Sequence, residues 1–407
     1  STRKESSAAS DVYKRQTAQT WGTRTRHKSE VTMQIIKRIA VLGAAGALAF
    51  ALSGCAGNAG NADKSGDDAG ASSSTGLDLG ISMPQKTSEN WVEAEKYFND
   101  LCKSEGLKCS VQFANNGVSE QQNQIDTMLT NGAKALIIGA IDGTSLGNQV
   151  QKAADAGVPV IAYDRLLMAT ENVDYYVAYD NFGVGVKQGE ALLKGLEAKK
   201  PGGPWTIEVV AGSNDDSNSA KFFDGAMSVL QPEIDAGKVT IGSGQNTQAQ
   251  AATQGWDPKN AQSRMDAILA QNYPGDKVPD GILSPNDTLA RAVLSSCEQA
   301  GKTLPVVTGQ DSEIESLKWI MQGKQYSTIS KPTKPLVESV VALAQKLLKG
   351  EKDVKDLNGI AVDDKQYDNT KKVVPAFLLP PVVATKDNAA EVYKDEPTKL
   401  EAVNSVK

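Results

Sequence analysis

An acidic and a basic residue stand side by side at the end of an apolar stretch. Residues 158–163 are mainly apolar, and Asp164 and Arg165 follow them directly. Such a run predicts a buried parallel strand, and ligands of open α/β sheets bind at the carboxyl ends of these strands. A carboxylate beside a guanidinium can accept from and donate to neighbouring hydroxyl groups. The pair therefore indicates a polyhydroxylated ligand or, as the alternative, a salt bridge that only closes the strand end.

Amide and acid side chains also follow the strands predicted at 205–210, 281–283 and 304–308. The carboxyl ends of parallel strands share one edge of a sheet, so these polar loops should converge. Their recurrence favours a binding site over isolated solvated loops. The residues concerned are Asp216, Asn218, Asn286, Asp287 and Asp311.

A sugar ring needs more than a polar rim, because C–H groups cover its two faces. Trp256 and Trp91 can supply an aromatic platform for those faces, and Lys331 adds a cationic donor. Trp256 has the alternative of packing at a helix entry, and Trp91 that of packing in the core. The alternatives for the other candidates are a helix cap for Asn286 and Asp311 and an exposed surface position for Lys86.

Short apolar strands alternate with helical segments along most of the chain. This alternation is typical of βαβ units with parallel sheets. We therefore expect an α/β architecture of two Rossmann-like lobes joined by several crossings, with a hinge near Asp180 and a cleft between the lobes. The expected N-terminal lobe comprises residues 77–181 and 309–329, and the C-terminal lobe residues 182–308 and 330–396.

The first part of the chain indicates export. Residues 1–32 are polar and precede Met33, so we interpret them as translated upstream sequence with a natural start at Met33. A short basic region, an apolar run and small residues before Cys55 are typical of a lipoprotein signal over 33–54. Because the apolar run is shorter than the roughly 18 residues of a spanning helix, we expect cleavage, lipidation of Cys55 and a flexible tether over 55–76. The protein would then be extracytoplasmic, anchored to the membrane at the cell surface or in the periplasm; a chance run before a buried cysteine is the alternative.

The composition excludes several kinds of partner. The formal net charge is −6, and the chain lacks the clustered Lys and Arg of a nucleic-acid surface. The single histidine, His27, precedes Met33, so a chain that starts at Met33 lacks the commonest general base and metal ligand. We therefore expect no nucleic acid, no metal and no cofactor.

Two of the four cysteines flank a predicted helix-to-strand turn at 103–108. An oxidising compartment would permit a disulfide between Cys102 and Cys109, and two separate thiols are the alternative. Cys297 is interpreted as a small buried residue of a helix, since burial is the usual fate of an unpaired cysteine.

Several segments taken together resemble the sugar-binding proteins of bacterial ABC importers, above all the ChvE-type multiple-sugar receptors and the xylose-binding proteins. The resemblance extends from about Leu77 to Lys386 and implies the type I periplasmic-binding fold, with a three-crossing hinge between its lobes. The matching segments are 161–166, 179–182, 224–230, 255–258, 283–287, 309–311 and 325–329.

The resemblance also implies which positions form the ligand pocket. Asn90 stands where the xylose-binding pattern has an arginine, so the contact between that arginine and xylose is not carried over to this chain. The segment 217–221 is less aromatic than the corresponding ChvE-type loop. The implied ligand residues are Asp164, Arg165, Asp216, Asn218, Trp256, Asn286, Asp287, Asp311 and Lys331, together with Lys86, Asn90 and Trp91 of one loop.

The expected function is that of a receptor rather than an enzyme. A monomer would capture a monosaccharide such as xylose, glucose, galactose or arabinose and deliver it to a membrane permease with its ATPase. A lipid-anchored glycosidase that uses two of the carboxylates is the alternative, since that chemistry needs no histidine. A receptor for a signalling sugar is a further alternative, whereas a DNA-binding repressor would need a helix-turn-helix headpiece in place of the tether.

Overall fold

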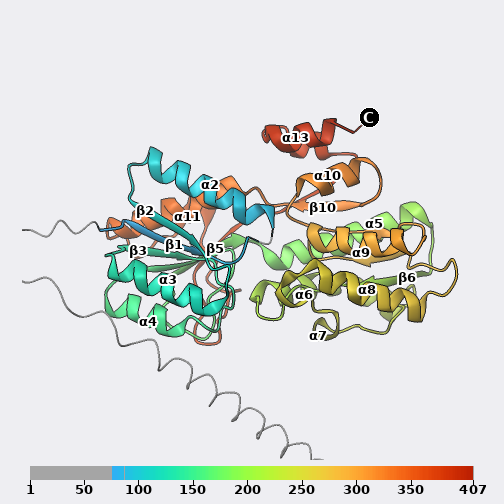
Figure 1. Ribbon diagram of the computed structural model, residues 1–407, viewed down its shortest axis with the longest axis horizontal. Helices are drawn as coiled ribbons and strands as arrows, with labels where there is room; N and C mark the ends of the chain where they lie inside the picture. The colour runs from blue at the N-terminus through green and yellow to red at the C-terminus, as the bar shows by residue number, and fades with distance from the viewer. Residues whose placement is uncertain (1–75, 87, 407) are drawn as a thin grey trace, which may run out of the picture. The chain divides into compact units, whose positions relative to one another are not determined.

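A computed structural model describes residues 76–86 and 88–406 of the chain (Figure 1). The predicted upstream segment (1–32), the predicted signal (33–54) and Cys55 lie outside the described residues, as does the predicted tether apart from its last residue. Among the described helices, none is long and apolar enough to cross a membrane.

Six parallel strands form the sheet of the N-terminal lobe, in the order β13-β5-β4-β3-β1-β2. Side chains alternate between the two faces, so Ile137 of β3 packs with α2 and α11 while Ile138 packs with α3 and α4. Helices thus cover both faces, as is typical of parallel sheets. The elements are β1 (Leu79–Met83), α2 (Glu89–Ser104), β2 (Cys109–Phe113), α3 (Val118–Thr130), β3 (Ala135–Ile138), α4 (Gly147–Asp155), β4 (Val160–Tyr163), β5 (Tyr175–Tyr179), α11 (Thr333–Leu348), the hairpin β11 (Asp356–Leu357) and β12 (Ile360–Ala361), and β13 (Ala376–Leu379).

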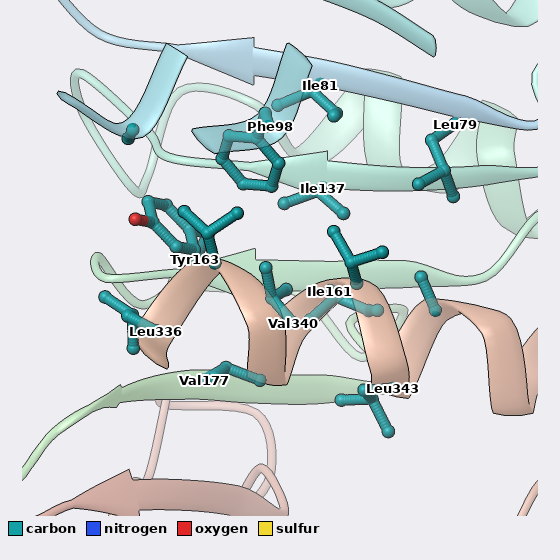
Figure 2. Packing of buried hydrophobic residues seen from close by; sticks show 14 of the residues in the cluster. Leu79, Ile81, Phe98, Ile137, Ile161, Tyr163, Val177, Leu336, Val340 and Leu343 are labelled. Carbon is teal, nitrogen blue, oxygen red and sulfur yellow. The ribbon is translucent and has the colours of Figure 1, made fainter. Parts of the chain in front are cut away.

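Long apolar side chains fill the core between this sheet and helices α2 and α11. Figure 2 shows Phe98 of α2 and Val340 of α11 close to Ile137 of the sheet. Tyr163, the last residue of β4, continues this core, because its ring lies 5.3 Å from the ring of Phe98 and 6.1 Å from that of Trp91. The strand end that carries the candidate site is therefore held in place by the hydrophobic core.

Four parallel strands form the sheet of the C-terminal lobe, in the order β7-β6-β8-β9. Helices α5 and α6 pack on one face and α8 and α9 on the other. The axes of α5 and α6 approach closely, since a Cβ atom on Gly185 would lie 2.1 Å from the carbonyl oxygen of Phe222. The elements are α5 (Asn181–Lys199), β6 (Trp205–Val209), α6 (Ser217–Asp235), β7 (Val239–Ile241), α7 (Gln248–Ala251), the 3₁₀ turn η1 (Gln254–Trp256), α8 (Pro258–Asn272), β8 (Gly281–Leu283), α9 (Asp287–Gln299) and β9 (Val306–Val307).

Three segments join the lobes, which lie within one compact unit. The chain leaves the first sheet at Asp180, whose carboxylate caps α5 by accepting a hydrogen bond from the Gly183 N–H (3.0 Å). It returns between β10 (Ser327–Ser330) and α11, and leaves again between β13 and β14 (Val382–Thr385), which pairs antiparallel with β10. The predicted α/β fold with parallel sheets is confirmed, and one crossing lies at the predicted hinge position.

The predicted boundaries of the two lobes are wrong after residue 308. Helix α10 (Ile314–Met321) and β10 were expected in the N-terminal lobe but pack in the C-terminal lobe, where α10 is covered by α12 (Ala389–Val392) and α13 (Pro397–Asn404). Conversely, α11 and β13 belong to the N-terminal lobe. The reason is long-range pairing, because Phe377 of β13 pairs in parallel with Val177 of β5 and α11 buries its apolar face on the same sheet.

Cys102 and Cys109 form a disulfide that links the end of α2 to the start of β2, with their Cα atoms 6.2 Å apart. This agrees with the predicted bridge. Cys297 is buried in α9, as its sequence context indicates.

Replacing Cys102 and Cys109 with serine should lower the free energy of unfolding by about 2 kcal/mol, because the bond restricts a short loop in the unfolded chain. Urea denaturation followed by circular dichroism measures the loss. Dithiothreitol should shift the wild-type midpoint to that of the double variant and leave the variant itself unchanged. Equal midpoints for the oxidised wild type and the variant would contradict this prediction.

Candidate ligand-binding site

A cavity lies between the two lobes, with a volume of about 460 Å³ counted out to its opening to solvent. Its walls come from the segments after β1, β4, β6, β8 and β9, from η1 and the start of α6, and from the crossing between β10 and α11. Ligands of parallel α/β sheets bind at these carboxyl ends. The lining residues are Ser88, Asn90, Trp91, Asp164, Arg165, Asp216, Asn218, Phe222, Trp256, Asn286, Thr288, Gln310, Asp311 and Lys331.

All of the predicted ligand-binding residues except Lys86 and Asp287 line this cavity. The structure therefore brings together side chains that are scattered over much of the sequence, and their contact with a ligand stays a prediction. The N-terminal lobe contributes Asn90, Trp91, Asp164 and Arg165, the C-terminal lobe contributes Asp216, Asn218, Trp256, Asn286 and Asp311, and a crossing contributes Lys331.

Lys86 lies on the surface outside the cavity. Its ammonium group pairs with Glu95 (Nζ–Oε2 2.7 Å) and lies 4.4 Å from the centre of the Phe113 ring. The structure thus favours the exposed alternative for Lys86 over a place in the ligand site.

Asp287 is fully buried and does not line the cavity. Its carboxylate accepts hydrogen bonds from Thr328 Oγ1 (2.9 Å), Gln325 Nε2 (2.8 Å) and the Glu313 N–H (3.0 Å). Burial, together with the charge of Glu313, raises the pKa of Asp287 well above its usual range. Asn286, one residue earlier, caps α9 and also lines the cavity. Asp287 therefore ties α9 to α10 and β10, and is not available to a ligand.

Four lining residues were not predicted from the sequence: Ser88, Phe222, Thr288 and Gln310. Phe222 follows Asn218 by one turn of α6, so the helical spacing could have placed it on the same face. Ser88 donates a hydrogen bond to Oδ1 of Asn90, and Thr288 and Gln310 stand close to predicted residues in the chain.

Arg165 forms an ion pair across the cleft. Its Nε lies 3.0 Å from Oδ2 of Asp216 in the other lobe, and both side chains are buried. Nη1 donates to the carbonyl oxygen of Ala140 (3.0 Å), and the guanidinium lies 5.4 Å from the centre of the Trp91 ring. Asp216 also accepts from Trp256 Nε1 (3.1 Å). The same carboxylate therefore orients a cation from one lobe and an aromatic ring from the other.

Asp164 is held by its main chain and leaves its carboxylate at the cavity. Its carbonyl oxygen accepts hydrogen bonds from the Tyr176 hydroxyl (2.5 Å) and from Asn218 Nδ2 (2.8 Å) of the C-terminal lobe. Burial raises the pKa of Asp164, although the charges of Lys331 and Arg165 act in the opposite direction.

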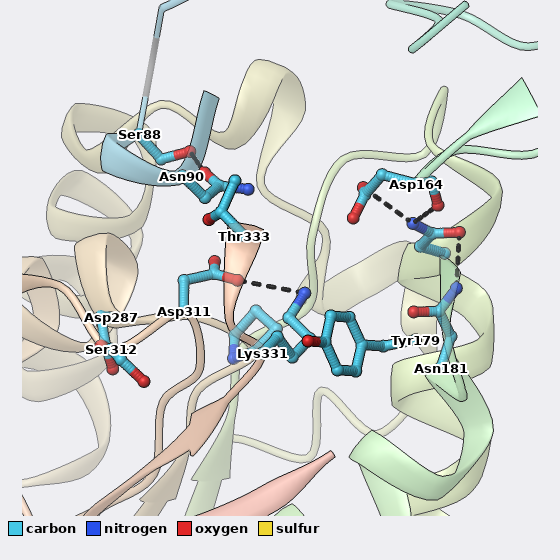
Figure 3. A network of polar contacts seen from close by, with 12 residues as sticks. Ser88, Asn90, Asp164, Tyr179, Asn181, Asp287, Asp311, Ser312, Lys331 and Thr333 are labelled. Carbon is cyan, nitrogen blue, oxygen red and sulfur yellow. Dashed lines mark hydrogen bonds and ion pairs between the residues drawn. The ribbon is translucent and has the colours of Figure 1, made fainter. Parts of the chain in front are cut away.

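Asp311 and Lys331 form a second buried ion pair, with 3.1 Å between Oδ1 and Nζ (Figure 3). Burial alone would lower the pKa of Lys331, but the carboxylates of Asp311, Asp164 and Asp216 outweigh it and raise that pKa. Lys331 is therefore a permanent cation at the centre of three acidic groups.

The backbone is strained at three positions of the site. Asp164 (φ 61°), Trp256 (φ 55°) and Asp311 (φ 90°) all have left-handed conformations that are uncommon for residues other than glycine. Such conformations collect at functional sites when the surrounding structure fixes them. In this chain they turn the three side chains toward one cavity.

The cavity combines hydrogen-bond donors and acceptors with aromatic rings. Three carboxylates, of Asp164, Asp216 and Asp311, face two cations, Arg165 and Lys331. In the part of the chain that the structure describes, no group of three or more His, Cys, Asp or Glu side chains could hold a metal ion. The arrangement suits a neutral ligand that carries many hydroxyl groups.

Comparison with known proteins points to one family. Residues 79–352 match the family described as periplasmic binding protein domain. The chain is 43% identical over 319 residues to the multiple sugar-binding periplasmic receptor ChvE of Rhizobium radiobacter, a match that covers 77% of this chain and 88% of the relative. It is 30% identical over 319 residues to the D-xylose-binding periplasmic protein of Escherichia coli (strain K12), with coverage of 78% and 89%.

A solved structure gives the same result. An ABC transporter solute binding protein from Clostridium phytofermentans, crystallised with bound β-D-glucose, superposes with a TM-score of 0.74 at 36% identity. The match covers 79% of this chain and 99% of that one. The resemblance predicted from the sequence is confirmed.

Proposed function

Because the chain belongs to the periplasmic binding protein family, we propose that it captures a monosaccharide, a pentose or a hexose, between its lobes and delivers it to an ABC importer. Members of this family are substrate-binding receptors and not enzymes, which removes the glycosidase alternative. The observation that carries the proposal is the cavity itself, which is lined by buried ion pairs and by one tryptophan from each lobe.

The side chains of the cavity match the two surfaces of a sugar ring. Arg165 and Lys331 can donate to ring hydroxyls, while Asp164 and Asp311 can accept from them. Trp256 is only half-buried and offers its ring to the C–H face of the sugar. An epimer of the preferred sugar places one hydroxyl in the wrong direction, so the buried side chain that would bind this hydroxyl stays unpaired. Each unpaired polar group lowers the binding free energy by about 1–3 kcal/mol. Selectivity among sugars follows from that cost.

A sugar in this cavity would contact both lobes and so stabilise their closed arrangement. Only interactions that differ between open and closed forms can shift the equilibrium between them. Arg165 and Asp216 come from opposite lobes, so a ligand that bridges them is bound fully only when the cleft is closed. The three crossings between the lobes provide the hinge.

The partners and location follow the same proposal. The closed receptor would dock as a monomer on a membrane permease with its ATPase. Lipidation of Cys55 would keep it extracytoplasmic and anchored to the membrane; this part rests on the sequence pattern before Cys55 and on relatives whose names describe them as periplasmic.

Isothermal titration of the full chain with D-glucose, D-galactose, D-xylose, L-arabinose and D-ribose tests the sugar-binding proposal, with mannitol as an acyclic control. We expect saturable binding of at least one cyclic sugar. The bound sugar should also stabilise the fold against urea, by about 2.7 kcal/mol at a concentration of 100 Kd. Absence of binding by every pentose and hexose tested would refute the proposal.

A further inference from the structure

Two glutamates of α2 contact the opposite lobe outside the ligand cavity. Glu89 reaches the start of α10, and Glu93, one turn later, reaches α13. We propose that Glu89 and Glu93 are affinity-setting residues: they stabilise the closed cleft and so tighten the binding of every ligand without touching it. This inference rests on the proposed sugar-binding function. The contacts of Glu89 and Glu93 with α10 and α13 are referred to as the closure contacts.

Glu89 caps the N-terminus of α10, a helix of the other lobe whose N-cap residue makes no side-chain capping bond. Its Oε2 accepts a hydrogen bond from the N–H of Ile314 (3.0 Å), the first residue of α10. The N-cap residue of α10, Glu313, makes no side-chain capping bond, because its carboxylate binds Thr288 Oγ1 (2.7 Å) and Arg291. A carboxylate at a helix N-terminus is favourable both as a hydrogen-bond acceptor and through the helix dipole. The cap of α10 thus comes from a residue 225 positions earlier, in the other lobe.

Glu93 pairs with a buried cation. Its Oε2 accepts from Thr333 Oγ1 of its own lobe (2.9 Å) and lies 3.9 Å from Nζ of Lys399 in α13. Lys399 is only 5% exposed, and its other carboxylate partner is Glu396 (2.9 Å). Thr333 therefore orients Glu93 toward a lysine that has little access to water.

Both closure contacts would be lost when the cleft opens, because α10 and α13 pack together in the C-terminal lobe while α2 belongs to the N-terminal lobe. Residues that contribute only in the closed form change the closing equilibrium, which is common to all ligands. Residues in the cavity instead contribute differently to different sugars. Loss of the closure contacts should therefore weaken the binding of all sugars by the same factor and leave the order of their affinities unchanged.

The test compares E89A, E93A and the double variant of the full chain with the wild type, using two sugars that the wild type binds. E95A is the matched control, since Glu95 lies on the same helix but pairs with Lys86 of its own lobe. We expect each single variant to raise Kd about threefold and the double variant about tenfold, mainly through faster dissociation. The ratio of the two Kd values should stay within about twofold of the wild-type ratio. E95A should change neither the two Kd values nor their ratio.

Unchanged affinity in the double variant would overturn the inference, as would a loss confined to one of the two sugars. A wild type that binds no sugar would instead refute the proposed function. In that event small-angle scattering still decides on the closure contacts: the ligand-free double variant must have a larger radius of gyration than the wild type, and an equal radius would overturn the inference. Thermal unfolding of the ligand-free variants checks that α2 itself is intact.

Discussion

Replacing Arg165 with alanine should weaken monosaccharide binding by about 2–5 kcal/mol, which raises Kd at least about 30-fold. Arg165 is the one cation that the N-terminal lobe brings to the cavity among its described lining residues, and it meets Asp216 across the cleft (3.0 Å). Its removal takes away a donor to the sugar and leaves the buried Asp216 carboxylate without its ionic partner. Isothermal titration with the sugar that the wild type binds best measures the loss.

Two further variants give this experiment its controls. K86A removes a cation from the same lobe that lies outside the cavity, so it should leave Kd unchanged. R165K keeps the charge but loses the planar fork of donors, and should fall between the wild type and R165A. A circular dichroism spectrum and melting curve for each variant separate loss of binding from loss of fold. Wild-type affinity in a folded R165A protein would remove Arg165 from the site.

The position of the site could be predicted from the sequence, because it follows from strand order and not from side-chain detail. Apolar runs that end in polar residues mark the carboxyl ends of parallel strands, and this rule placed Asp164, Arg165 and Asp311 at the cavity. The partner of Arg165 could not be predicted in this way. It pairs with Asp216 across the cleft and not with its neighbour Asp164, and Asp216 lies about 50 positions later in the chain.

Adjacent residues at a helix start show a second limit. Asn286 and Asp287 both carry hydrogen-bonding groups, and both are suitable sugar ligands by chemistry alone. Asn286 is the N-cap of α9 and has an extended backbone, whereas Asp287 is the first residue of the helix, so the two side chains leave the chain in different directions. Asn286 lines it, whereas Asp287 turns inward to Thr328 and Gln325. Those two partners are about 40 positions away, and nothing local in the sequence marks them.

The lobe boundaries show a third limit, which concerns pairing between distant segments. Short apolar strands alternate with helices as the sequence predicted, and β13 is one of these strands. Its partner in the sheet is β5, some 200 positions earlier. Both strands are mainly apolar, so their composition does not identify them as partners. Periodicity fixes which residues are buried, but not which sheet buries them.

Replacing Asp311 with asparagine should cost about 3 kcal/mol of unfolding free energy, because the buried Lys331 ammonium loses the carboxylate with which it pairs. It should also abolish sugar binding, because the site loses a charged acceptor for sugar hydroxyls. The side chains of Asp311 and Lys331 are 9% and 8% exposed and lie 3.1 Å apart. Asparagine tolerates the left-handed φ of 90° at this position, so the loss reports the charge and not the backbone. Urea denaturation measures the stability, and isothermal titration measures the binding.

The double variant D311N/K331M separates the two roles of this pair. Replacing both members of a buried pair by uncharged groups of similar size is often nearly neutral for stability, so the double variant should regain most of the unfolding free energy that D311N loses. Sugar binding should stay lost, because both the acceptor and the donor of the site are gone. D100N breaks the exposed pair of Lys96 and Asp100 and should change neither quantity. If D311N were as stable as the wild type, the carboxylates of Asp164 and Asp216 alone would compensate the charge of Lys331. If the double variant bound sugar normally, the pair would have only a structural role, and the rest of the cavity would hold the ligand.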